Sequence, residues 1–161
     1  MKIYTLYRKQ RLALSLEEAW PFFSTPHNLN LITPDFLHFR ITSRVPDEIH
    51  SGLIISYRIA AVAGIPMTWV TEIKHVERYR QFVDEQRLGP FRFWHHLHRF
   101  QATDDGIDME DIVHYVMPGG GLGPVLHRVF IARRLEQIFE YRWDYLAQRF
   151  GGVGGVKSAI S

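Results

Sequence analysis

Apolar and polar residues alternate along much of the chain between residues 1 and 117, and this period of two is typical of β-strands. The alternating stretches are rich in β-branched and aromatic residues, and clusters of Gly, Pro, Asp and Ser separate them. Strands are predicted over residues 1–14, 36–43, 53–61, 67–76, 78–87, 91–102 and 107–117. Asp104-Asp105-Gly106 predicts a tight hairpin before the last of these strands. The pattern therefore predicts an antiparallel meander of about seven strands.

Two short helices are predicted after the first strand. Ser15 has the character of a helix N-cap, and Glu18 three residues later completes the pattern of a capping box. The helix that follows carries apolar residues up to Phe23. Pro26 and Pro34 then bracket a segment that is long enough for only one or two turns.

The period changes near the C-terminus, where apolar residues recur every three or four positions from about Leu122 to Phe150. This spacing predicts one long amphipathic helix. Its apolar stripe is formed by Val125, Val129, Ala132, Phe139, Trp143, Leu146 and Phe150. Glycines end the helix, so residues 1–150 are predicted to form one domain and residues 151–161 a flexible, glycine-rich tail. An antiparallel sheet with one long helix is an α+β layout, and a curved sheet around such a helix leaves a cavity.

Composition narrows the classes of function. The net charge is only +2 and the arginines are spread along the chain, so a nucleic-acid partner is not expected. The absence of cysteine excludes disulfides, thiolate metal sites and a cysteine nucleophile. The N-terminal residues lack the apolar core of a signal peptide, and no apolar run reaches the roughly 18 residues of a membrane span. We therefore expect a soluble, cytoplasmic protein without an integral membrane segment.

Most candidate functional residues lie in residues 81–100, which are predicted to form two strands joined at Leu88-Gly89-Pro90. Because side chains alternate along a strand, Trp94, His96, His98 and Phe100 share one face of the second strand. Phe82, Asp84 and Gln86 share one face of the first strand. Each face mixes large aromatic groups with hydrogen-bonding groups, as the wall of a binding site does.

Counting back from the Asp104-Asp105-Gly106 turn brings Asp111 level with His98 or His96. A histidine and a carboxylate at this distance could act as a base and its orienting group, but a structural hydrogen-bonded pair is the more common arrangement of buried polar groups. If the site is catalytic, the candidates are His96, His98, Asp111 and Tyr115. A zinc site with His96, His98 and Asp111 as ligands is a narrower alternative. The sequence does not show the tight clustering that such a site needs, so we predict no metal and no cofactor.

Two further groups have alternative readings. Gln86 beside Trp94 and Trp69 could orient the polar group of a ligand, or its amide could turn to the backbone within a Trp-rich core. Arg142 on the long helix could meet a ligand carboxylate at the cavity, or it could pair with a glutamate of the sheet at the surface, which is the more common arrangement.

The order of elements resembles the START-like or SRPBCC superfamily, whose helix-grip fold occurs in the birch-pollen allergen, lipid-transfer START domains and aromatase/cyclases. The resemblance covers residues 1 to about 150. Locally, FVDEQRLGPFRFWHHLHRF and the Asp111, Tyr115 and Pro118 of DIVHYVMP resemble a bacterial subgroup described as ligand-binding or cyclase/dehydrase-like. This resemblance implies a helix-grip fold and a pocket but no particular substrate, because the fold serves many functions.

The expected function is binding, or binding and transfer, of a hydrophobic small molecule such as a lipid, quinone, polyketide or aromatic compound. The alternative is a cyclase- or dehydratase-type enzyme that uses His96 or His98 with Asp111 or Tyr115 in the same pocket. No nucleophile motif or phosphate-binding loop is present, which favours binding. The residues expected to bind the ligand are Trp69, Phe82, Gln86, Trp94, His96, His98, Asp111, Tyr115, Phe139 and Arg142.

Overall fold

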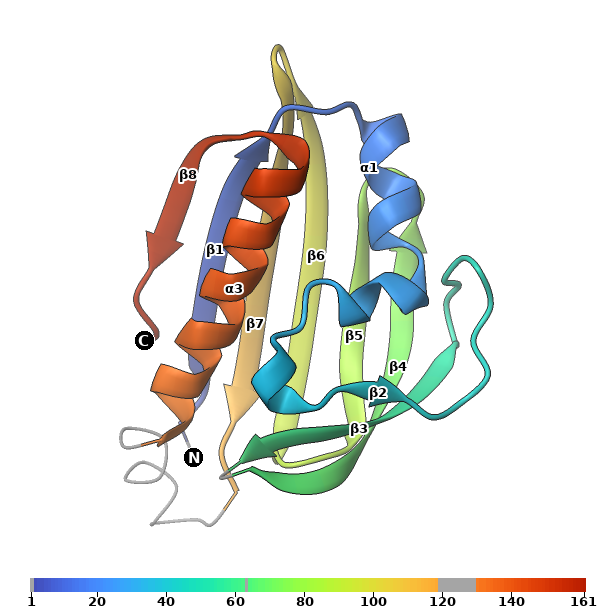
Figure 1. The fold of residues 1–161 in the computed structure, drawn as a ribbon, viewed down its shortest axis with the longest axis vertical. Coiled ribbons are helices and arrows are strands. Elements are labelled where there is room, and N and C mark those ends of the chain that lie inside the picture. Colours follow the sequence, from blue (N-terminus) through green and yellow to red (C-terminus); the bar gives the residue numbers. More distant parts are fainter. Residues whose placement is uncertain (1, 63, 119–129) are drawn as a thin grey trace.

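The computed structural model describes residues 2–62, 64–118 and 130–161. One curved antiparallel sheet of eight strands, in the order β2-β3-β4-β5-β6-β7-β1-β8, carries its helices on one face (Figure 1). The strands are β1 (Tyr4–Leu12), β2 (Arg40–Ile41), β3 (Ile54–Val62), β4 (Ile65–Glu77), β5 (Gln81–Leu88), β6 (Phe93–Thr103), β7 (Gly106–Val116) and β8 (Gly152–Ser158). This arrangement confirms the helix-grip α+β fold predicted from the sequence.

Helix α1 (Leu16–Phe23) begins at its predicted N-cap, Ser15, and the Ser15 and Glu18 side chains form the predicted capping box. Two short 3-10 helices follow, η1 (Pro26–Asn30) and η2 (Asp35–Leu37). The long helix α3 (Ala132–Phe150) ends at Gly151, which adopts the left-handed conformation with φ of 74°. The first part of the predicted long helix, residues 122–129, lies outside the described residues.

Two segments differ from their predicted form. The strand predicted over residues 36–43 is reduced to the two residues of β2, because η2 and the left-handed His38, with φ of 47°, interrupt the extended chain. Residues 152–158, expected within a tail, form β8 and pair with β1. A side chain at Gly155 would approach the Lys9 carbonyl oxygen within 2.1 Å, so the missing side chain is what lets the two strands come together.

Helix α3 lies across the face of the sheet near β1 and β7, and α1 covers the same face further along (Figure 1). The face of α3 that meets the sheet is formed by Leu135, Phe139, Arg142 and Leu146. Trp143, which the sequence placed in the apolar stripe, is instead half-buried beside β8, where the Lys157 ammonium lies 4.5 Å from its ring centre. Within the described ranges, no helix combines the length and hydrophobicity needed to cross a bilayer.

Candidate functional site

A cavity of about 160 Å³ lies between α3, the segment that contains η1 and η2, and the inner face of the sheet. Most of its wall is apolar or aromatic and includes Leu37, Ile59, Trp69, Phe91, Trp94 and Phe139. Asp84, His96, His98 and Arg142 form a polar group within this wall. Half-buried Thr33, Arg134 and Ile138 mark where the cavity approaches the surface between α3 and the η segment.

A second, smaller cavity of about 80 Å³ lies beneath α1 and η1. Phe23, Ile49, Ile55 and Phe82 line it on the apolar side. Asp84, His98 and Arg142 contribute to the walls of both cavities. These three polar side chains therefore lie between the two cavities.

Strand pairing explains why these polar side chains meet. In the β5–β6 pair, Asp84 is opposite His96, and in the β6–β7 pair, His98 is opposite Asp111. Alternation turns His96 and His98 to the inner face, where both are buried. Asp111 was predicted to lie level with His98 or His96, and the pairing places it opposite His98.

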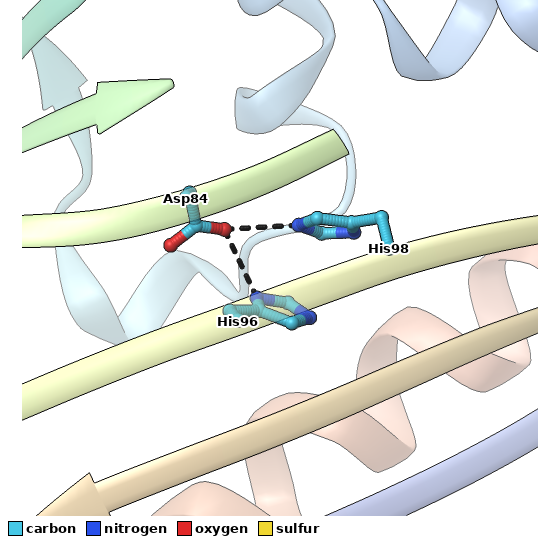
Figure 2. Close-up of side chains that lie close together, drawn as sticks. All are labelled: Asp84, His96 and His98. Carbon is cyan, nitrogen blue, oxygen red and sulfur yellow. Dashed lines mark hydrogen bonds and ion pairs between the residues drawn. The ribbon is translucent and has the colours of Figure 1, made fainter. Parts of the chain in front are cut away.

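Each imidazole is held between two carboxylates. The Asp84 Oδ2 atom lies 2.9 Å from His98 Nε2 and 3.1 Å from His96 Nδ1 (Figure 2). On the other side, Asp111 Oδ1 lies 2.8 Å from His96 Nε2 and 3.1 Å from His98 Nδ1. The two rings lie with their centres 3.8 Å apart. The four side chains form one compact unit spanning β5, β6 and β7.

Outer contacts fix both carboxylates. The buried Arg142 places Nη2 3.2 Å from Asp111 Oδ1 and 3.3 Å from His98 Nδ1. The Trp94 indole N–H donates to Asp84 Oδ1 at 3.1 Å. The Asp84 side chain is 20% exposed and that of Asp111 only 8%, so Asp84 is the carboxylate that opens towards the cavity.

Both carboxylates are held in the ionised form. Burial alone would raise the pKa of Asp84, but the charge and hydrogen bonds of His96 and His98 outweigh it and lower this pKa. Burial opposes ionisation of Asp111 as well, yet the Arg142 guanidinium and the hydrogen bonds from both histidines hold the pKa of Asp111 well below its usual range.

The pKa values of the two histidines are shifted in opposite directions. Burial disfavours the charged form of His96, but Asp84 and Asp111 outweigh this effect and raise its pKa. Burial and the neighbouring His96 charge together lower the pKa of His98, despite hydrogen bonds to Asp111 and Asp84. At pH 6.5 the site thus favours a charged His96 beside a neutral His98. Asp84 engages Nε2 of the His98 ring, while Asp111 and Arg142 engage its Nδ1.

The other residues that the sequence predicted to bind a ligand differ in whether they line a cavity. Trp69, Trp94 and Phe139 line the larger cavity, and Phe82 lines the smaller one with its ring stacked on His98 at 4.2 Å between centres. Asp111 is on the far side of the imidazoles from Asp84 and is not among the described residues that line either cavity.

Two predicted residues lie beside the cavity rather than in its wall. Tyr115 stacks on Tyr4 and contacts Trp94 and Phe91, both of which line the cavity. Gln86 turns to the backbone of Phe91, donating to its carbonyl oxygen at 2.6 Å and accepting from its N–H at 3.2 Å. This is the structural arrangement of the two that the sequence left open for Gln86.

Sequence reasoning did not assign a role to Asp84 and favoured a surface pair for Arg142. The alternation had placed Asp84 on the inner face, so counting the β5–β6 register across the Leu88-Gly89-Pro90 turn would have found it opposite the histidines. Arg142 is buried because its carboxylate partner Asp111 lies in the interior of the sheet, which the helix period alone does not reveal.

No family model and no curated protein matches the chain. Solved structures do match over almost its whole length. A protein from Rhizobium leguminosarum is 14% identical with a TM-score of 0.63, covering 91% of this chain and 96% of that one. Ara h 8.0201 is 14% identical with a TM-score of 0.57, covering 91% of this chain and 99% of its own.

The di-domain ARO/CYC StfQ from the steffimycin biosynthetic pathway is 12% identical with a TM-score of 0.61. The match covers 91% of this chain and 52% of StfQ. At these identities the similarity is one of fold, and it agrees with the helix-grip architecture.

Proposed function

We propose that this protein binds a hydrophobic small molecule in the cavity between α3 and the sheet. The observation that carries the proposal is a mainly apolar cavity, rich in aromatic side chains, in which the polar side chains Asp84, His96, His98 and Arg142 are grouped together. Apolar walls with a few placed polar groups are the usual composition of small-molecule sites. The similarity in fold to Ara h 8.0201 and to a domain of the ARO/CYC StfQ supports a ligand-binding role.

The size of the cavity limits the ligand. A volume of about 160 Å³ is close to that of an apolar cavity that accepts a single benzene-sized ring. The ligand portion that enters is therefore compact, such as the ring of a quinone or another aromatic compound. A carbonyl or hydroxyl group on that ring would face Asp84, His98 and Arg142, and any longer chain would leave near Thr33 and Ile138.

Titration with menadione, whose quinone ring would enter the cavity while its fused second ring lies towards Thr33 and Ile138, tests this function. Trp69 and Trp94 line the cavity, and a quinone in contact with an indole quenches its fluorescence, so we expect saturable quenching. Trp94→Phe should reduce the quenching amplitude, whereas Trp143→Phe, which alters an indole beside β8, should leave the affinity unchanged. Quenching that does not saturate, or that depends on Trp143 alone, would rule out this cavity as the site. Mass spectrometry of the protein as purified would identify a molecule that remains bound.

A proton-transfer enzyme of the cyclase or dehydratase type is the second candidate. It is favoured by a histidine with a lowered pKa on the wall of an apolar cavity, because a neutral imidazole whose Nε2 is released from Asp84 can remove a proton from a bound ketone. In the dehydration of an aromatic β-hydroxy ketone, His98 would remove the proton from the carbon next to the carbonyl group and return it to the departing hydroxyl group, which leaves as water. Mass spectrometry should then detect the unsaturated ketone with the native protein and not with His98→Gln, while formation at equal rates with both would exclude this role.

A further inference from the structure

Three side chains on the cavity wall converge in a manner that ligand binding alone does not require. One carboxylate oxygen of Asp84 and one ring nitrogen from each of His96 and His98 lie within 4.8 Å of one another (Figure 2). The three residues come from the adjacent strands β5 and β6, whose backbones are fixed by the ladder between them. Two imidazoles and one carboxylate on rigid strands are a set of metal ligands that proteins use repeatedly.

We propose that Asp84, His96 and His98 bind one divalent transition-metal ion at the wall of the cavity. The set differs from the one considered from the sequence, in which Asp111 was the third ligand and no metal was expected. Asp111 faces the opposite nitrogens of the two rings, so it cannot share an ion with the atoms that face Asp84. The carboxylate that completes the set is on β5 rather than on β7.

The position of Asp111 supports the proposal. Metal-bound histidines almost always donate their second ring N–H to a carboxylate, a carbonyl or a water, which fixes the tautomer and the ring orientation. Asp111 Oδ1 lies 2.8 Å from His96 Nε2 and 3.1 Å from His98 Nδ1, so one carboxylate can accept from both rings when His98 Nδ1 carries its proton and does not accept from Arg142. The nitrogens left over, His96 Nδ1 and His98 Nε2, are the two that face Asp84.

The carboxylates have outer partners as well. Trp94 donates to Asp84 Oδ1 at 3.1 Å and leaves Oδ2 directed towards the histidines. Arg142 holds Asp111 from the helix side at 3.2 Å. Each of the three proposed ligands is thus oriented by a second side chain, as an ion of fixed geometry requires.

The charges of Asp84, Asp111, Arg142 and the two histidines are also compatible with a bound divalent cation. At pH 6.5 the charged His96 and Arg142 balance the carboxylates of Asp84 and Asp111. An ion that binds His96 Nδ1 displaces the proton of that nitrogen, which leaves one negative charge among these side chains. A divalent cation would compensate that charge.

The donor set selects the kind of ion. Imidazole suits Zn²⁺, Fe²⁺ and Co²⁺, whereas Mg²⁺ and Ca²⁺ prefer oxygen ligands throughout. Three protein ligands leave at least one coordination position for another donor. Asp84, His96 and His98 all line the larger cavity, so that position would be available to an oxygen atom of a molecule bound there.

The test uses metal ions alone, without an organic ligand. The chelator-treated, desalted protein is titrated with Co²⁺ and followed by visible absorption, and Zn²⁺ binding is measured by calorimetry. We expect one ion per chain, displacement of Co²⁺ by Zn²⁺, and no binding of Mg²⁺ at the same concentration. Asp84→Asn and His98→Gln should each weaken Zn²⁺ binding at least about 100-fold, and Asp111→Asn about 10- to 100-fold.

His95→Gln is the matched control, because His95 is on the same strand but points to the opposite face. It should leave the affinity unchanged. The native protein also provides a test that needs no variant, since paramagnetic Co²⁺ should shift the ring signals of His96 and His98 before those of His95 and the exposed His50. The proposal is overturned if no ion binds at one per chain, if Asp84→Asn folds and binds Zn²⁺ as the native protein does, or if the signals of the other histidines shift first.

Discussion

Arg142 of α3 and Asp111 of β7 form an ion pair of 3.2 Å between Nη2 and Oδ1, and both side chains are more than nine-tenths buried. This pair joins the long helix to the centre of the sheet beside the two histidines. A buried carboxylate that loses its partner is costly, because no water replaces the lost interaction. The pair therefore couples the position of α3 to the charge of the site.

Removal of Arg142 should destabilise the fold. Arg142→Met retains much of the side-chain volume but leaves Asp111 without its guanidinium, and we expect the free energy of unfolding at neutral pH to fall by about 3 kcal/mol. Urea denaturation measures the change. Arg133→Met, on the exposed side of the same helix, should change stability by less than about 0.5 kcal/mol. Equal losses in the two variants would show that the buried pair contributes little.

The two histidines should titrate on opposite sides of the value of about 6.5 that is usual for a free imidazole. The pKa of His96 is raised by Asp84 and Asp111 against the effect of burial, while that of His98 is lowered by burial and by His96. NMR titration of the ring protons should therefore show His96 largely charged and His98 largely neutral at pH 6.5. Titration of both rings on the same side would contradict this division.

The same pKa shifts determine whether each histidine makes the fold more or less stable as the pH changes. The contribution of His96, whose pKa is raised, is fully present below pH of about 6.5 and is lost as the pH rises through its folded pKa. The contribution of His98, whose pKa is lowered, is present above about pH 6.5 and is lost as the pH falls through its folded pKa. Urea denaturation of His96→Gln and His98→Gln over this range should show opposite changes relative to the native protein.

Filling the cavity should block the ligand without unfolding the protein. Ile138→Trp adds an indole to the half-buried part of the cavity wall on α3, and we expect the affinity for menadione to fall at least about tenfold. Stability should change by less than about 1.5 kcal/mol, because the added atoms enter empty space. Ile54→Trp, at a site 46% exposed on β3, should leave menadione binding unchanged. Binding that survives Ile138→Trp would place the ligand elsewhere.

Strand β8 depends on the absence of a side chain at Gly155. A methyl group there would lie 2.1 Å from the Lys9 carbonyl oxygen and 2.5 Å from Trp143 Cη2, so Gly155→Ala should separate β8 from β1. Hydrogen exchange of the β1 amides that face β8 should become faster. Gly154→Ala is the matched control, since Gly154 also has positive φ, at 123°, but a methyl group there meets no atom within 4 Å. If both variants exchange alike, backbone strain rather than close contact controls the pairing.

Much of the fold could be predicted because its signals are local. The capping box of Ser15 and Glu18 and the hairpin at Asp104-Asp105-Gly106 are specified by residues next to one another in the sequence. The register of His98 with Asp111 followed from the length of that hairpin. The sequence therefore predicted three of the four side chains of the histidine–carboxylate unit, His96, His98 and Asp111.

What could not be predicted depends on contacts between distant segments. Strand β8 is glycine-rich and its residues are exposed, so it has none of the alternation that marks a strand; it forms because β1 offers a free edge. Arg142 occupies a buried position on α3 because Asp111 lies beneath it, which no helical period encodes. The direction of the Gln86 amide likewise depends on the backbone of Phe91 in the following turn.

The two ends of the sheet have a consequence for how the protein behaves at high concentration. A long, flat, apolar outer strand is a template on which other chains can add and aggregate. Here one border is β2, which has only two residues, and the other is β8, in which three of seven residues are glycine and Lys157 adds a charge. Neither edge strand offers an incoming strand a long apolar partner, so the edges of the sheet do not favour the addition of strands from other molecules.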